Sequence, residues 1–430
     1  MKALAQELID AILGELEAVE ATENHRDRER KGLKSCSLVA RNFRGASQRR
    51  LFRSASVGSV PKVMAGFAHS PRLLSYVRDL RVFVRDGPNT DYPDYDSLAS
   101  ILQLLSGIQE LLIISSTSWY LESSPSFRIA LHSVLSRPSL RCLGFQCPTV
   151  PSAIILHALS SCKAVALDTF QLIPSEKPHD TPLDAGDEWP PPALTVTVDR
   201  LFLRYLPTRS LAVHDLLLTT SAQKCLHNLR AMTIELLGSG SLYGLEKVVI
   251  QCLSLQHLVL DFNMFLSRQD RNAPPFPLPI IPTLRLLTFK AVMTEIRVPN
   301  SLMSAIPTLP TCTPKLEVLT FHLGGDWEKR PRGMTEQSQA DEALTTLPHL
   351  VEAHFIVHTD GCIGRLARSV RAQLPLSSDA GLLCFSHTRF RGTGWHAEYF
   401  SDPDSALLVD LSETWESDES ADDDWSDYSY

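Results

Sequence analysis

The stretch LQHLVLDFN, residues 255–263, decides the fold. Its apolar residues Leu255, Leu258 and Leu260 stand at the first, fourth and sixth places, and Asn263 closes it. Alternate residues of a β-strand point to opposite faces of a sheet, so Leu258 and Leu260 share one face. The pattern predicts a short strand that follows a turn and buries one face in a core.

The same apolar-x-x-apolar-x-apolar hexad recurs along the chain at intervals of about 30 residues. The clearest copy begins at Leu255. Weaker copies begin at Leu140, Leu229, Leu284, Leu316 and Leu350, and four more degenerate copies begin at Val77, Ile108, Ala164 and Val198. The segments between the hexads have helical periodicity, for example SLASILQLLSGI (97–108), PSAIILHALSSC (151–162) and DEALTTLPHL (341–350). Each unit therefore pairs a helix with a short strand.

Residues 255–263 match the leucine-rich-repeat strand template, L-x-x-L-x-L-x-x-N, at every key position, so this part of the chain resembles that class. One such unit cannot bury its apolar face alone, whereas stacked units share a core. We therefore expect an α/β fold in which residues 70–376 form an irregular leucine-rich-repeat solenoid. A doubly wound sheet also alternates helices and strands and remains the alternative. The repeated hexad and the short strands favour the solenoid.

The C-terminal part changes character. Residues 377–411 contain GLLCFSHTRF and GWHAEYFS, which predict two strands that cap the last repeat. Residues 412–430 carry eight acidic residues, no basic residue and little apolar surface, so we expect a disordered acidic tail. Its two Trp and two Tyr residues allow a partner-binding motif, although a solubilising tail is the simpler interpretation.

Composition argues against several function classes. The formal net charge is −8, and without the tail the chain is nearly neutral, which is unusual for a nucleic-acid binder. With the body of the chain nearly neutral, the arginines near the N-terminus (41, 44, 49, 50 and 53) fit a solvated helix face better than a nucleic-acid site. No apolar run reaches about 18 residues, which argues against a membrane span. Nine cysteines without a C-x-x-C pair indicate a reducing compartment, cytoplasmic or nuclear. No catalytic motif, metal site or cofactor-binding loop is recognisable, so we expect no enzyme.

An amphipathic helix opens the chain. In MKALAQELIDAILGELEAVE the residues Leu4, Leu8, Ile9, Ile12, Leu13 and Leu16 form one apolar stripe, opposite polar residues. The segment LKSCSLVARNFRGASQRRLFRS (33–54) adds a second amphipathic element, so residues 1–55 predict three short helices. Such a small unit is marginal alone and gains stability by docking on something else.

This N-terminal segment resembles the F-box family. ALAQELIDAILGEL is similar to the family's opening helix, and LKSCSLVARNFRGASQRRLF is similar to its second half in the form common among fungal F-box-like proteins. The resemblance implies a subunit that recruits a client protein to a cullin-RING (SCF-type) ubiquitin ligase through a Skp-type adaptor. An amphipathic helix laid in an apolar groove is a standard recognition mode. The residues expected to contact the adaptor are Leu4, Leu8, Ile9, Ile12, Leu13, Leu38 and Val39.

The client would bind the concave side of the solenoid. Residues that alternate with the buried positions of each strand leave the core and face that side. The expected client-binding residues are His257, Asp261, Lys290, His322, Glu352 and His354. The alternative from another class is a leucine-rich-repeat scaffold that binds other proteins without any ligase.

Overall fold

The structure, a computed structural model, describes residues 7–14, 31–39, 41–57, 71–84, 95–116, 119–168, 171–173, 198–205, 211–237, 245–264, 278–292, 305–324, 338–357, 363–389 and 407–410. The chain is mixed α/β and divides into two compact units. Unit 1 comprises residues 1–235, 243–255 and 391–405, and unit 2 comprises residues 236–242, 256–390 and 406–430.

Unit 1 begins with helices and continues as alternating helices and strands. A helix at residues 7–14 precedes α2 (Lys31–Val39) and α3 (Arg41–Leu51). The strands that follow are β1 (Ser54–Val57), β2 (Asp79–Val84), β3 (Glu110–Ser115), β4 (Cys142–Gln146), β6 (Ala164–Asp168), β8 (Arg200–Tyr205) and β9 (Ala231–Leu237). The helices are α5 (Pro71–Leu74), α6 (Tyr95–Leu104), α7 (Trp119–Glu122), α8 (Pro125–Leu135), α9 (Ser152–Ser161), α10 (Leu211–Leu217), α11 (Thr220–Leu226) and α12 (Leu245–Gln251). The short strands β5 (Thr149–Pro151) and β7 (Gln171–Ile173) pair separately.

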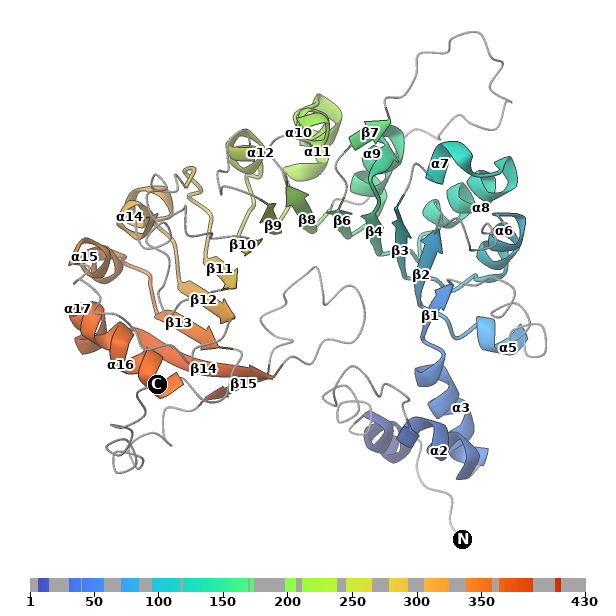
Figure 1. Ribbon diagram of the computed structural model, residues 1–430, viewed down its shortest axis with the longest axis horizontal. Helices are drawn as coiled ribbons and strands as arrows, with labels where there is room; N and C mark the ends of the chain where they lie inside the picture. Colours follow the sequence, from blue (N-terminus) through green and yellow to red (C-terminus); the bar gives the residue numbers. More distant parts are fainter. Residues whose placement is uncertain are drawn as a thin grey trace, which may run out of the picture. The chain divides into compact units, whose positions relative to one another are not determined.

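Unit 2 continues the alternation. Its strands are β10 (His257–Met264), β11 (Leu286–Val292), β12 (Val318–Gly324), β13 (Glu352–Val357), β14 (Leu383–Arg389) and β15 (Leu407–Asp410). Its helices are η3 (Ile306–Thr308), α14 (Leu309–Cys312), α15 (Ser338–Thr346), α16 (Ile363–Gln373) and α17 (Pro375–Asp379). In each unit the helices that alternate with the strands, from α5 onward, cover one face of the strands (Figure 1). The face that carries none of the described helices is called the open face below.

The strand order follows the chain order within each unit. In unit 1 it is β1-β2-β3-β4-β6-β8-β9, and in unit 2 it is β10-β11-β12-β13-β14-β15. The strand pairs from β1 to β8 and from β10 to β14 are parallel, and β14–β15 is antiparallel. A doubly wound sheet reverses its strand order at a switch point, which neither unit does. The order is compatible with the expected solenoid.

The predicted hexads coincide with strands. Each of the ten hexads contains a strand, which in nine of them starts at the third residue. The exception is the copy placed at Ala164, where the strand starts at once, so its first position is Cys162. The structure also adds β1, a strand that no hexad predicted: its sequence is SASV, and Val57 is the one buried residue among the four.

One pattern of backbone hydrogen bonds recurs at the starts of β2, β3, β4, β6, β8, β9, β11, β12 and β13. The carbonyl of Gln256 accepts the amide N–H groups of Arg285 and Leu286, both at 2.9 Å. Arg53 does the same for Arg78 and Asp79, which extends the pattern to β1. The other acceptors are Arg78, Gln109, Arg141, Lys163, Asp199, Arg285 and Glu317. Because these bonds tie the residue before one strand to the start of the next strand, they fix the register between the paired strands.

The C-terminal end differs in detail from the expected cap. β14 (383–389) lies within GLLCFSHTRF as predicted, but it pairs in parallel with β13, so the parallel run continues beyond residue 376. Its antiparallel partner is β15 at 407–410. The segment GWHAEYFS and the tail 412–430 lie outside the described residues.

A buried carboxylate joins two helices of unit 2. Asp341 on α15 is 1% exposed and accepts hydrogen bonds from the amide N–H groups of Leu376 (2.7 Å) and Ser377 (2.8 Å) and from the Ser377 hydroxyl (2.5 Å). These donors belong to the first turn of α17, whose amide groups have no intrahelical acceptor. Asp341 therefore fixes the position of α17 against α15.

We expect Asp341→Ala to lower the free energy of unfolding by about 2–3 kcal/mol, because it leaves buried donors without an acceptor. Asp341→Asn keeps one acceptor oxygen and should cost less. Urea unfolding followed by circular dichroism measures both values. Glu342→Ala, at the exposed neighbouring position, is the control and should change stability by less than about 0.5 kcal/mol. Equal losses at the two positions would contradict this role of Asp341.

Candidate functional site

The three N-terminal helices enclose a small core. Ile9 and Leu13 are buried at 1% and 0% exposure and pack with Ala46 of α3. Cys36, Phe43 and Leu51 pack around this cluster. Arg50 Nη2 donates a hydrogen bond to the Asp10 carbonyl at 3.0 Å, which ties α3 to the helix at residues 7–14. The two halves of the segment thus form one packed unit.

A second set of apolar residues on the same helices faces outward. Leu8 and Ile12 are 47% and 42% exposed, and Leu38 on α2 is 79% exposed. Leu8 and Ile12 stand four residues apart, so they are neighbours on one helix surface. The stripe predicted from the sequence therefore has two sides: Ile9 and Leu13 fill the interior, while Leu8 and Ile12 face outward. Ile9 and Leu13, which were expected to contact the adaptor, are buried in this structure and not accessible to a partner. Leu4 and the side chain of Val39 lie outside the described residues.

The open face of unit 2 carries the six residues expected to bind a client. Counted from the first hexad residue, they occupy the third, fifth and seventh positions. Asp261, Lys290 and His322 are seventh-position residues that pair in register across β10, β11 and β12. His257 and Glu352 are third-position residues and His354 is a fifth-position residue. All are half-buried except His354, which is 8% exposed. The structure thus brings these residues to one face.

His354 belongs to a polar chain on this face. Its Nε2 lies 2.8 Å from the Ser386 Oγ, and its Nδ1 lies 3.5 Å from Glu352 Oε1. An acid, an imidazole and a hydroxyl in this order resemble the arrangement used in nucleophilic hydrolysis. Ser386, however, is 2% exposed and lies on β14, which is paired on both sides. A substrate cannot reach that hydroxyl. We therefore interpret the three polar side chains as a structural link between β13 and β14.

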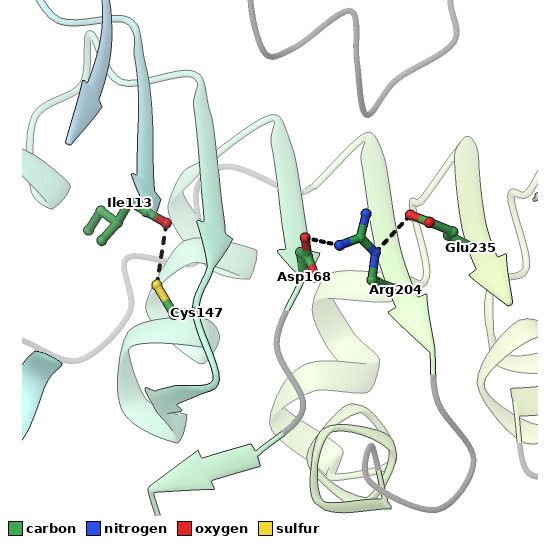
Figure 2. Close-up of polar contacts among 5 residues, drawn as sticks. All are labelled: Ile113, Cys147, Asp168, Arg204 and Glu235. Atoms are coloured by element: carbon green, nitrogen blue, oxygen red, sulfur yellow. Dashed lines mark hydrogen bonds and ion pairs between the residues drawn. The ribbon is translucent and has the colours of Figure 1, made fainter. Parts of the chain in front are cut away.

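The open face of unit 1 carries a charged cluster that sequence analysis missed. Figure 2 shows Arg204 on β8 between Asp168 on β6 and Glu235 on β9. Arg204 Nη1 lies 2.5 Å from Asp168 Oδ2, and Arg204 Nε lies 2.9 Å from Glu235 Oε2. The side chain of Asp168 is only 2% exposed. Burial raises the pKa of Asp168 to about 6, and Glu235 adds to the rise while Arg204 opposes it.

A second carboxyl pair stands at the opposite ends of the strands. Asp79 and Glu110 are third-position residues that pair in register on β2 and β3, and the Ser54 hydroxyl donates to Asp79 at 3.1 Å. Burial is the main cause that raises the pKa of Glu110 to about 7, and Asp79 raises it further, against Arg53 and Arg81. Between the two acidic ends lies a buried apolar cluster of Leu112, Cys142, Ala164, Ala166 and Phe202.

Glu110→Gln tests the cost of the Glu110 charge. The folded-state pKa lies above the unfolded value, so the native protein binds more protons between about pH 4.5 and 7 and loses stability as the pH rises through that range. We expect Glu110→Gln to raise the melting temperature at pH 8 and to have little effect at pH 5, where the wild-type carboxyl is neutral. Thermal unfolding at both pH values measures this. Glu342→Gln, at an exposed site, should show no such difference, and a Glu110→Gln effect independent of pH would contradict it.

The buried cysteines are poor nucleophiles. Burial raises the pKa of Cys142, Cys147 and Cys252 to about 12 and that of Cys162 to about 11. The Cys147 thiol donates to the Ile113 carbonyl at 3.3 Å, which fastens the end of β4 to β3 (Figure 2). A thiolate is the reactive form, so these thiols are packing groups and not catalytic residues.

Comparison with known proteins adds no assignment: no family model and no curated protein matches the chain. Among the described residues, no helix combines the length and the apolar content that crossing a bilayer requires. The functional interpretation therefore depends on the residues and their geometry.

Proposed function

We propose that this chain is the substrate-recognition subunit of a cullin-RING (SCF-type) ubiquitin ligase, in the cytoplasm or nucleus. In this proposal the N-terminal helices are an F-box-like unit that binds a Skp-type adaptor, and the parallel strands belong to an irregular leucine-rich-repeat solenoid that binds a client protein. The assignment of the N-terminal helices to the F-box fold, and of the strands to leucine-rich repeats, rests on the sequence resemblance.

One observation carries the proposal. The N-terminal unit fills its own core with Ile9 and Leu13 and still leaves Leu8, Ile12 and Leu38 exposed. Burying one such side chain fully is worth about 1.5–3 kcal/mol, so a partner groove that covers three of them gains substantial affinity. The resemblance names the partner as the adaptor, and the open faces of the two units supply polar and charged side chains for a client.

The test is adaptor capture by the full chain. Leu8→Asp with Ile12→Asp should weaken adaptor binding by at least about 100-fold, because two apolar contacts are replaced by buried charges. The matched control is Ile250→Asp with Leu253→Asp, which also replaces two exposed apolar residues, at 53% and 64% exposure. The control should retain the adaptor, and both variants should keep the wild-type melting temperature.

Two outcomes would reject the ligase. Wild-type protein that never retains the adaptor would instead favour a ligase-independent scaffold. Equal loss in the test and control variants would show that the exposed face at Leu8 and Ile12 has no special role. A second pair of substitutions tests the client-binding residues separately. Lys290→Glu with His322→Glu should leave adaptor capture unchanged and should reduce client recovery in proximity labelling.

A further inference from the structure

Helix α16 (Ile363–Gln373) in unit 2 has a strongly cationic outer face. Its inner side packs through Leu366 and Val370, which are 4% and 2% exposed. Arg368 and Arg371 lie on the outside, and both residues are exposed. The sequence IGRLARSVRAQ contains a third arginine and no acidic residue. We call Arg368 and Arg371 the arginine face of α16.

The acidic tail starts close to this face. β15 ends at Asp410, which pairs in register with Ser386 of β14. The guanidinium of Arg371 lies over the ring of Phe385, the neighbouring residue on β14, at 5.4 Å from the ring centroid. Adjacent strands are about 4.8 Å apart. The tail therefore begins roughly one strand spacing from β14, the strand whose Phe385 contacts Arg371.

We propose that residues 412–430 bind the arginine face of α16 in the same molecule. The charges are complementary, because the tail carries eight acidic residues and no basic one. Its nineteen residues span up to about 65 Å when extended, far more than the binding needs. A tethered segment of this length has an effective concentration in the millimolar range, so weak contacts are sufficient.

The chemistry of the tail suits arginine in particular. Carboxylates accept bidentate hydrogen bonds from a guanidinium, and the tail's Trp415 and Trp425 offer aromatic faces on which a guanidinium stacks. Arg371 already makes such a contact with Phe385. Asp379 on α17 is an exposed acidic residue on the helix that packs beside α16. Its negative charge repels the acidic tail at that end of the arginine face. The inference does not depend on the proposed ligase function.

Zero-length cross-linking of the full chain tests the proposal. Arg368→Lys with Arg371→Lys keeps both charges and supplies amines that a carbodiimide joins to carboxylates in contact with them. Mass spectrometry then counts the links to tail residues. Lys224 on α11 and Lys247 on α12 are exposed native lysines and serve as internal controls. Mixing isotopically light and heavy protein separates links within one chain from links between two chains.

We expect the introduced lysines to link to the tail at least about tenfold more than Lys224 or Lys247, within one chain, and the excess to disappear at about 0.5 M salt. In the otherwise native chain, Arg368→Glu with Arg371→Glu should speed proteolysis of the tail, and Lys224→Glu with Lys247→Glu should not. Links spread evenly over the lysines, links only between chains, links that persist at high salt, or unchanged proteolysis would each overturn the proposal.

Discussion

Phe321→Ala should lower the free energy of unfolding of unit 2 by about 3–5 kcal/mol. Phe321 is fully buried and stands in a ladder of phenylalanine rings that face the helices. Its ring centroid lies 5.6 Å from that of Phe289 and 4.8 Å from that of Phe355, with interplanar angles of 27° and 14°. The substitution removes two stacked contacts and leaves a cavity between β11 and β13, which flanking rings can fill only in part.

Two companion variants separate stacking from burial. Phe321→Leu keeps an apolar side chain and should cost less than the alanine variant. Phe262 lies at one end of the ladder, with a centroid separation of 6.3 Å from Phe289 and an angle of 34°, so Phe262→Ala should also cost less. Urea unfolding by circular dichroism measures all three. A Phe321→Ala loss no larger than that of Phe262→Ala would show that the ladder does not hold the unit together.

The strands could be predicted because their apolar positions repeat. Leu258, Phe289 and Phe321 stand at fourth or sixth hexad positions, where one buried apolar side chain per position is enough to reveal the strand. β1 was missed because three of its four residues are partly or fully exposed. Its parallel pairing with β2 and the hydrogen bonds to the Arg53 carbonyl show that it belongs to the series. Periodicity detects burial, whereas pairing through the backbone leaves no mark on the sequence.

The N-terminal helices show a different limit. Leu8, Ile9, Ile12 and Leu13 form a single apolar stripe in the sequence, which cannot say how the stripe is shared between the chain's own core and a partner. That division depends on where α3 packs, and the contact of Ala46 with Ile9 and Leu13 fixes it. The sequence therefore predicted an amphipathic helix correctly but gave Ile9 and Leu13 the same role as their exposed neighbours.

The charged cluster of unit 1 was missed because one hexad was placed two residues too late in the sequence. Asp168, Arg204 and Glu235 are seventh-position residues, the same position as Asp261 and Lys290 in unit 2. With the hexad placed at Ala164 instead of Cys162, Asp168 falls out of this position and the alternation of charge from strand to strand is lost. The signal was present in the sequence, but only the register between strands makes it readable.

Arg204→Ala should be the most damaging change on the open face of unit 1. It leaves the carboxylates of Asp168 and Glu235 facing each other without their shared cation, while Asp168 stays buried. Removing one member of a buried ionic cluster typically costs about 3–5 kcal/mol, because an uncompensated charge remains in a poorly solvated place. We expect a loss of this size at pH 8, measured as the free energy of unfolding in urea.

The same loss should shrink as the pH falls. Arg204 lowers the pKa of Asp168, which is already about 6 in the native protein, so its removal moves that pKa higher still. A folded-state pKa above the unfolded value means that the native protein takes up protons as the pH falls, which restores stability below that pKa. At pH 5 a proton on Asp168 replaces the missing cation, and most of the deficit should disappear.

Asp168→Asn provides the matched test. In the Arg204→Ala background it removes the buried charge permanently, so the double variant should recover most of the lost stability at pH 8 and should lose the pH dependence. Arg204→Lys keeps a cation but cannot donate in a fork to both carboxylates, so its stability should fall between those of wild type and Arg204→Ala. A deficit that is equal at pH 5 and pH 8, or that Asp168→Asn does not relieve, would mean that Arg204 acts through packing and not through its charge.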